Sequence, residues 1–283
     1  MIKITECPRD AMQGIKTFIP TEVKAHYLNL LLKVGFDRLD FGSFVSPKAT
    51  PQMRDTSQLV DQLDTDSSRS DLLAIVANIR GANDALQFEK INILGFPFSV
   101  SETFQLRNTN STIAQSLDTV KAISDLCLKS SKTPLVYLSM GFGNPYGDEW
   151  NADIIAKYTE KIVALGVNEI MLSDTTGESN PEKIKYLYPL LKNEFPEISL
   201  GLHLHSKPQE TDAKLQAALE VGCTRFDTTL RGFGGCPMAK DELTGNIATE
   251  NLIALLSNNN MQHQLNMDAW NEALSYSWRV FNP

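Results

Sequence analysis

Two histidines separated by one residue, His203 and His205, are the sharpest chemical feature of the sequence. Alternate residues of a strand point to the same face, roughly 6.6 Å apart, so both imidazoles can reach one divalent ion while Leu204 points into the outer packing layer. The pair therefore predicts a metal site. Two imidazoles alone suit zinc, copper or iron, whereas a carboxylate such as Asp10 and a neutral oxygen ligand add up to a site that Mg²⁺ or Mn²⁺ can use. The alternative is a pair of polar residues at a strand end.

Other reactive residues follow apolar runs in the same way. Arg9 and Asp10 come directly after the first run, and Asp40 ends the second. A guanidinium fixed over a pocket would stabilise an oxyanion, while Asp10 faces the metal. The alternative for Arg9 and Asp10 is a surface ion pair.

Asp174 follows the sixth apolar run, within Ser173–Gly177. A functional role is favoured because Asn180 and Pro181 already supply the cap and first turn of the next helix. The alternative is a turn residue that bonds its own backbone.

Cys236 lies in the glycine-rich segment Gly232–Pro237. A thiol on a mobile lid can enter and leave a pocket, which favours a functional role over that of a buried structural cysteine. Asn246, just before Ile247–Glu250, is interpreted from the residues alone as an ordinary helix cap. His26 and His263 are predicted to be surface residues.

Alternating strands and helices would bring these residues together. The strands are expected near residues 2–6, 36–41, 72–76, 90–95, 134–139, 168–173, 198–204 and 224–229. Helices that end at Gly35, Gly166 and Gly222 precede three of them, at 21–34, 154–165 and 211–221. Eight strands separated by helices predict an α/β fold, the (β/α)₈ TIM barrel, whose function gathers at the carboxyl ends of the strands.

The sequence shows no linker or composition break, so residues 1–283 are predicted to form a single domain. A C-terminal helical extension is expected over about 246–283, with a helix at 246–258 and a last helix packed on the barrel. An open doubly wound sheet is the structural alternative.

Composition excludes several classes of protein. The formal net charge of −8 gives no general attraction for nucleic acid or anionic lipid, so a polyanionic ligand would need a local basic patch. Apolar runs are too short for a membrane helix, and residues 2–5 do not resemble a signal peptide. The four cysteines form no C-x-x-C pair and are expected to be thiols. A cytoplasmic protein is expected.

Six motifs, in order along the chain, resemble those of the 3-hydroxy-3-methylglutaryl-CoA lyase family, part of the DRE-TIM metallolyase superfamily. They are Pro8–Gln13, Ser43–Lys48 with Pro51–Met53, Asp174–Thr175 with Gly177, His203–His205, Gly234–Pro237, and Gly245–Asn246 with Ala248–Glu250. The Ser-Phe-Val-Ser-Pro-Lys and Gly-Gly-Cys-Pro segments are specific to the lyases, whereas the wider superfamily shares mainly the first-strand Arg-Asp and the H-x-H.

The resemblance implies a TIM barrel in which Asp10, His203, His205 and Asn246 hold Mg²⁺ or Mn²⁺. It implies that Arg9 steadies the enolate of acetyl-CoA and that Cys236 acts in acid/base chemistry. The rest of the implied catalytic set is Asp40, Asp174, His203 and Glu250. The expected substrate contacts are Arg9, Gln13, Lys16, Ser46 and Lys48, and the two lysines are candidates for the local basic contacts that CoA phosphates need in an acidic protein. The implied reaction is retro-Claisen cleavage of 3-hydroxy-3-methylglutaryl-CoA to acetyl-CoA and acetoacetate. Apart from the resemblance, TIM-barrel enzymes commonly assemble through their helices, so a homodimer or tetramer is expected.

Three residues depart from the family pattern: Asp40 replaces the usual Glu, Ala11 a glycine, and Ser206 an aspartate. Such changes around a metal site can reduce metal affinity or activity by about 10–100-fold. Two alternatives therefore accompany the lyase hypothesis. One is a related aldolase, Claisen-type synthase or lyase for another 3-hydroxyacyl-CoA, and the other is a catalytically impaired barrel that binds metal or CoA.

Overall fold

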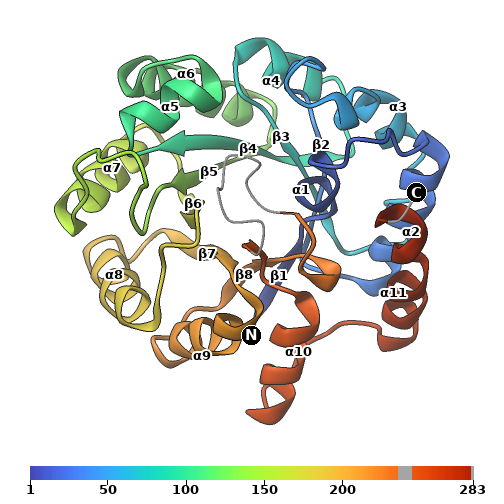
Figure 1. Cartoon of the computed structure of the whole chain (residues 1–283). Helices are drawn as coiled ribbons and strands as arrows, with labels where there is room; N and C mark the ends of the chain where they lie inside the picture. Colours follow the sequence, from blue (N-terminus) through green and yellow to red (C-terminus); the bar gives the residue numbers. More distant parts are fainter. Residues whose placement is uncertain (235–243, 282–283) are drawn as a thin grey trace.

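The computed structural model describes residues 1–234 and 244–281. Eight parallel strands each pair with two neighbours, because β1 pairs with β8 and β6 pairs with β7, and the sheet closes into a barrel (Figure 1). The strands are β1 (Lys3–Glu6), β2 (Arg38–Ser43), β3 (Asp71–Ile75), β4 (Ile91–Ser99), β5 (Thr133–Ser139), β6 (Glu169–Asp174), β7 (Ser199–Ser206) and β8 (Arg225–Thr228). The predicted TIM barrel is confirmed, and the open-sheet alternative is wrong.

Helices surround the barrel (Figure 1). They are α1 (Pro8–Gln13), α2 (Thr21–Val34), α3 (Thr56–Asp61), α4 (Ile79–Ala85), α5 (Glu102–Thr109), α6 (Ile113–Lys129), α7 (Ala152–Ala164), α8 (Pro181–Glu194), α9 (Thr211–Glu220), α10 (Thr249–Asn258) and α11 (Met267–Phe281), with short 3₁₀ turns at Pro51–Met53, Pro208–Glu210 and Leu230–Gly232. The helix expected over 21–34 is confirmed. It ends at Gly35, whose left-handed φ of 76° is easy for glycine and costly for other residues.

Strand alternation separates two apolar layers. Leu73, Ile75, Leu135, Tyr137 and Met171 form a cluster with Ile93 inside the barrel. The residues between them on the strands belong to the larger core beneath the helices: Leu72, Ala74, Val136, Leu138, Ile170 and Leu172. On β7 the same alternation buries Leu204 in the outer layer, as expected, and turns His203 and His205 inward.

The chain after β8 departs from the sequence prediction. Gly245 and Asn246 form a short strand, β9, that runs antiparallel to β7 and pairs Asn246 with His205. Helix α10 begins only at Thr249, and its N-cap is Ala248. The helix-cap interpretation of Asn246 is therefore wrong. The last helix, α11, packs along α2, through ring contacts that include Tyr27 with Phe281 (Figure 1).

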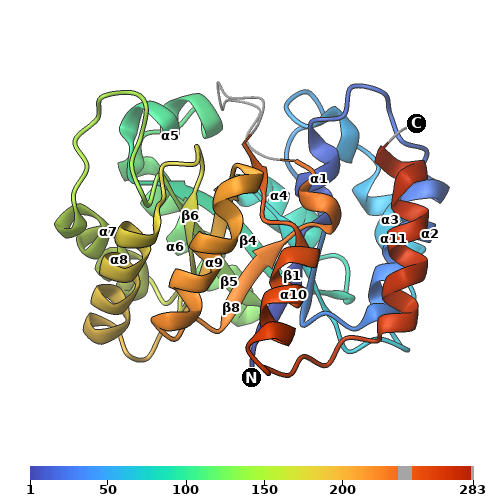
Figure 2. The same ribbon diagram turned by 60° about the horizontal axis from the view of Figure 1, so that its bottom comes forward.

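Helices α1 and α5 lie at the same end of the barrel (Figure 2). Pro8 occupies the first turn of α1, where its missing N–H is not needed. Arg9 and Asp10 consequently lie on a short helix rather than at a strand end, and both side chains reach the barrel mouth. Within the described residues, no helix is both long and apolar enough to cross a membrane.

Candidate active site

A cavity of about 350 Å³ lies at the carboxyl ends of the strands. Its lining includes Arg9, Asp10 and Gln13 from α1 and the two histidines of β7, and α5 covers one side with Phe104, Arg107, Asn108 and Thr109. The cavity thus gathers the H-x-H pair and the Arg-Asp pair into one space, at the end of the barrel where such enzymes hold their substrates.

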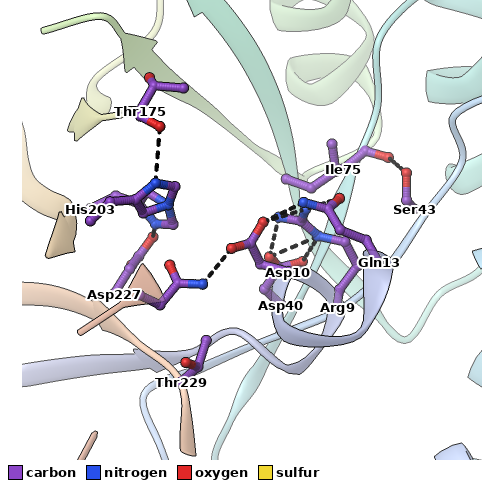
Figure 3. A network of polar contacts seen from close by, with 12 residues as sticks. Arg9, Asp10, Gln13, Asp40, Ser43, Ile75, Thr175, His203, Asp227 and Thr229 are labelled. Carbon is purple, nitrogen blue, oxygen red and sulfur yellow. Dashed lines mark hydrogen bonds and ion pairs between the residues drawn. The ribbon is translucent and has the colours of Figure 1, made fainter. Parts of the chain in front are cut away.

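The two histidines are held so that the same nitrogen of each faces a common point. Nδ1 of His203 lies 3.2 Å from Oδ2 of Asp227, and Nδ1 of His205 lies 3.0 Å from the carbonyl oxygen of Thr175 (Figure 3). A carboxylate and a carbonyl can only accept, so both Nδ1 atoms carry the proton and donate it. The two Nε2 atoms lie 3.3 Å apart, and ligand atoms of Asp10, His203 and His205 lie within 4.8 Å of one another.

This geometry fits a divalent cation. Two nitrogen lone pairs facing each other at 3.3 Å repel unless a positive charge lies between or beside them. Pairing of β9 with β7 adds Asn246, whose Nδ2 donates to Oδ2 of Asp10 at 2.6 Å and to the carbonyl of Phe233 at 3.1 Å. Its amide nitrogen is thereby engaged, which leaves the amide oxygen as its ligand atom. Two imidazoles, a carboxylate and an amide oxygen form a mixed set that suits Mn²⁺ or Mg²⁺.

Arg9 is fixed by carboxylates on two sides. Its Nε donates to both Asp40 oxygens at 3.1 and 3.2 Å, its Nη2 to Oδ2 of Asp40 at 2.5 Å, and its Nη1 to Asp10 at 3.1 Å and Gln13 at 2.9 Å (Figure 3). Arg9 and Asp10 are both buried, so the surface ion-pair interpretation is wrong. Asp40 is fully buried and does not line the cavity, which makes it a residue that positions Arg9.

Burial and charge act against each other in this cluster. Burial raises the pKa of Asp40 to about 6 although Arg9 opposes it. Burial would also raise the pKa of Asp10, but Arg9 and the two histidines outweigh it and hold that pKa below its usual value. Burial lowers the pKa of His205, whereas for His203 the hydrogen bond and charge of Asp227 overcome burial and raise the pKa.

Two residues of the site were missed in the sequence. Asp227 lies on β8 opposite His203 in the strand register, so a carboxylate near the end of the eighth strand was the available signal. Tyr137 on β5 lines the cavity, and its ring packs edge-on against the His203 ring with 5.5 Å between the ring centroids. Its hydroxyl is buried without a hydrogen-bond partner among the described residues.

Asp174 and Glu250 lie outside the cavity lining. The Asp174 carboxylate accepts from the backbone N–H groups of Glu178 at 2.7 Å and Ser179 at 3.0 Å, so the structure gives it the turn role that sequence reasoning ranked second. Glu250 accepts from the backbone N–H of Arg231 at 2.9 and 3.1 Å. Both carboxylates thus stabilise loops that border the site.

The predicted substrate contacts divide into two groups. Gln13 lines the cavity with Arg9, whereas Lys16, Ser46 and Lys48 are exposed and lie outside its lining. Ser46 instead lines an adjoining polar cavity of about 290 Å³, which shares Ser43 and Val45 with the first and contains Arg54 and Arg80. Cys236 lies outside the described residues.

The fold and the site define a class: a parallel (β/α)₈ barrel with a candidate site for a divalent metal at the carboxyl ends of its strands. Comparisons with known proteins narrow this class. The HMGL-like family model matches residues 2–275. The hydroxymethylglutaryl-CoA lyase of Bacillus subtilis is 32% identical over 249 residues, which cover 88% of this chain and 82% of that protein.

Two further relatives agree. The mitochondrial hydroxymethylglutaryl-CoA lyase of Mus musculus is 29% identical over 99% of this chain and 86% of its own length. An HMG-CoA lyase from Acinetobacter baumannii, solved in complex with coenzyme A and 3-methylmalate, superposes with a TM-score of 0.91 at 30% identity, covering 100% of this chain and 92% of that one. The chain belongs to the HMGL-like family.

Proposed function

We propose that the chain is a divalent-metal-dependent carbon–carbon lyase that cleaves 3-hydroxy-3-methylglutaryl-CoA to acetyl-CoA and acetoacetate. The observation that carries the proposal is the convergence of Asp10, His203 and His205 beside the fixed guanidinium of Arg9. The lyase relatives support the choice of substrate, and the coenzyme A bound to the Acinetobacter enzyme supports an acyl-CoA ligand.

Asp10, His203, His205 and Asn246 would hold Mg²⁺ or Mn²⁺, and Asp227 and Thr175 would orient the two imidazoles. When bound, the ion makes the tertiary hydroxyl of the substrate more acidic and fixes its orientation. Because the lone pair of the His203 Nε2 would be used to hold the ion, His203 would position the substrate hydroxyl in this proposal, and the proton would pass to another group.

Arg9 supplies the charge that the bond cleavage needs. As the C2–C3 bond breaks, its electron pair moves onto the acetyl fragment, and the resulting enolate carries negative charge on the thioester oxygen. The hydrogen bonds of Arg9 to described residues engage Nε, both N–H groups of Nη1 and one of Nη2. Arginine has five N–H donors, so one remains on Nη2 for that oxygen.

Cys236 is proposed as the acid/base group. The hydroxyl proton leaves the substrate when the C=O of acetoacetate forms, and one proton returns to the enolate carbon to complete acetyl-CoA, so the reaction consumes no net proton. A single cysteine can do both, because its thiolate accepts the first proton and the thiol so formed delivers a proton to the enolate carbon. In the proposal Asp174 and Glu250 support the loops, and Asp40 holds Arg9.

The adjoining cavity offers a place for the distal part of the thioester. Arg54 and Arg80 line it, and guanidinium groups suit phosphate better than single ammonium groups do. Phosphates bound there would need neither Lys16 nor Lys48. The proposal also includes a homo-oligomer, a dimer or tetramer, and a cytoplasmic location, and both stay predictions.

The test is acetoacetate release from 3-hydroxy-3-methylglutaryl-CoA by the purified protein, with Mg²⁺ or Mn²⁺ added and then removed by a chelator. We expect turnover with the ion and none with the chelator, and Asp10→Asn should abolish it. Metal binding without acetoacetate release would refute this substrate, and other 3-hydroxyacyl-CoA thioesters would then be assayed. Full activity of Asp10→Asn would refute the metal site.

A further inference from the structure

A second cluster of ligand atoms lies behind the candidate metal site. Atoms of Cys7, His203 and Asp227 lie within 4.8 Å of one another, each residue offering one ligand atom. Cys7 is 1% exposed, and the Asp227 side chain is 1% exposed. This inner cluster shares His203 with the outer set of Asp10, His203 and His205.

The two clusters face different nitrogens of the shared ring. Nε2 of His203 faces His205, whereas Nδ1 faces Oδ2 of Asp227. Figure 3 shows His203 next to Asp227, with Asp10 to one side. The inner cluster is therefore built around Nδ1.

Asp227 adds an independent indication of a ligand. One of its oxygens accepts from His203, and the other, Oδ1, is buried without a hydrogen-bond partner among the described residues. An unpaired carboxylate oxygen in the interior costs free energy unless a cation or a donor compensates it. Among the described residues, the hydrogen bond of the Cys7 sulfur is a weak one, from Sγ to the carbonyl of Thr5 at 3.8 Å.

We propose that Cys7, His203 and Asp227 form an inhibitory site for a thiophilic divalent ion such as Zn²⁺. Thiolate, imidazole and carboxylate are the ligands that zinc prefers, and tetrahedral zinc holds such atoms about 3.3–3.6 Å apart. The 3.2 Å between Nδ1 and Oδ2 is already close to that spacing. Mg²⁺ has little affinity for sulfur, so it would stay in the outer set.

Occupation of the inner site would take His203 away from the outer site. The ion displaces the Cys7 thiol proton to solvent, and the proton on Nδ1 moves to Nε2 as the imidazole changes tautomer. A neutral imidazole has one lone pair, so His203 can then no longer bind an ion through Nε2.

Cobalt distinguishes the two sites without relying on activity. Thiolate bound to Co²⁺ gives an intense charge-transfer absorption in the near ultraviolet, whereas nitrogen and oxygen ligands give only weak visible bands. The background is Cys236→Ser, which removes the loop thiol. We expect the charge-transfer band in this background and its loss in Cys7→Ser/Cys236→Ser, with Cys223→Ser/Cys236→Ser retaining it as a matched buried-cysteine control.

Inhibition gives the second readout. With Mn²⁺ present in excess, Zn²⁺ should inhibit the protein with a native Cys7 at least about tenfold more strongly than it inhibits Cys7→Ala, while the Mn²⁺-dependent rate is the same in both. A charge-transfer band that survives without Cys7, or equal zinc inhibition of the two proteins, would overturn the proposal.

If the Cys7 variants do not fold, zinc X-ray absorption on Cys236→Ser decides. One sulfur neighbour per zinc supports the inner site, and a nitrogen and oxygen shell alone refutes it. These spectroscopic outcomes do not depend on lyase activity, so a failure of the proposed reaction would be seen separately.

Discussion

Replacing Asp40 by Asn should make the protein more stable and less active. The substitution keeps the shape of the side chain and removes its charge. Asp40 is fully buried and accepts from Nε of Arg9 at 3.1 and 3.2 Å. Burial nevertheless raises its pKa to about 6 from an ordinary 3.8, so ionising Asp40 costs more in the folded protein than in the unfolded chain, and Asn avoids that cost.

The size of the effect follows from the pKa. A rise from 3.8 to about 6 is roughly two units, and each unit corresponds to about 1.4 kcal/mol, which gives about 3 kcal/mol. Because the pKa of Asp40 is higher in the folded protein, protonated Asp40 favours folding by this amount. The contribution is fully present below pH 4 and is lost as the pH rises through 6. Asp40→Asn should therefore be about 3 kcal/mol more stable than the parent at pH 7.5, and the two should converge near pH 4.

Urea unfolding with a chelator present measures this difference at each pH. Asp148→Asn is the opposite control, because hydrogen bonds from Ser101 and Thr103 lower the pKa of Asp148. That variant should lose stability at neutral pH and converge with the parent in acid. An Asp40→Asn protein that is about 3–5 kcal/mol less stable at pH 7.5, the usual cost of breaking a buried ion pair, would refute the reasoning.

The same substitution frees Arg9 on one side. Displacement of a catalytic group by about 1 Å can cost 100-fold in rate, so we expect kcat to fall about 10–100-fold while Mn²⁺ affinity changes little. Unchanged kcat would mean that Asp10 and Gln13 hold Arg9 sufficiently by themselves.

Three further substitutions test other parts of the site. Asp227→Asn should weaken Mn²⁺ binding about 10–100-fold, because Asp227 orients the His203 ring. Titration calorimetry measures the affinity, and an unchanged value would contradict that role. Arg80→Ala should raise KM for the thioester about tenfold with kcat unchanged, through loss of a charge-assisted bond to phosphate, and an unchanged KM would favour Lys16 instead. Arg231→Gly should fold with similar urea stability but turn over several-fold more slowly. Glycine relieves the left-handed φ of 64° at this position. The substitution also removes the hydrogen bonds from Nε of Arg231 to Ser277 and from Nη2 to the Leu274 carbonyl, which connect the loop after β8 to α11. An unchanged rate would show that these bonds do not position the site.

The barrel and half of the site could be predicted because their signals are local. The helix–glycine–strand units give the order of elements, and alternation on β7 places His203 and His205 on one face whatever the rest of the chain does. Leu204 falls in the outer layer for the same reason. The ends of the strands were predicted less well, since β4 runs to Ser99 whereas the predicted strand ends near residue 95.

The remaining residues depend on contacts across the sheet. Asn246 resembles a helix cap in sequence, and only the pairing of β9 with β7 places it beside His205. Asp227 becomes a partner of His203 only once β7 and β8 are in register. For Asp174 the local turn signal is confirmed, because short Asp side chains at strand ends readily bond the backbone that follows, and its catalytic role stays a prediction.

The electrostatics of the site explain these contacts together. Asp10, Asp40 and Asp227 carry three negative charges and Arg9 one positive charge, all buried, which leaves an excess of two. Buried charge in excess is costly, and the protein reduces it by raising the pKa of Asp40 and of His203. A divalent cation held by Asp10, His203, His205 and Asn246 would bring the sum to zero without any change in protonation. The same negative charges surround Cys7, so charge alone cannot make the two clusters prefer different ions. In our proposal the difference comes from the ligand atoms, because the inner cluster contains a sulfur and the outer set contains oxygen and nitrogen alone.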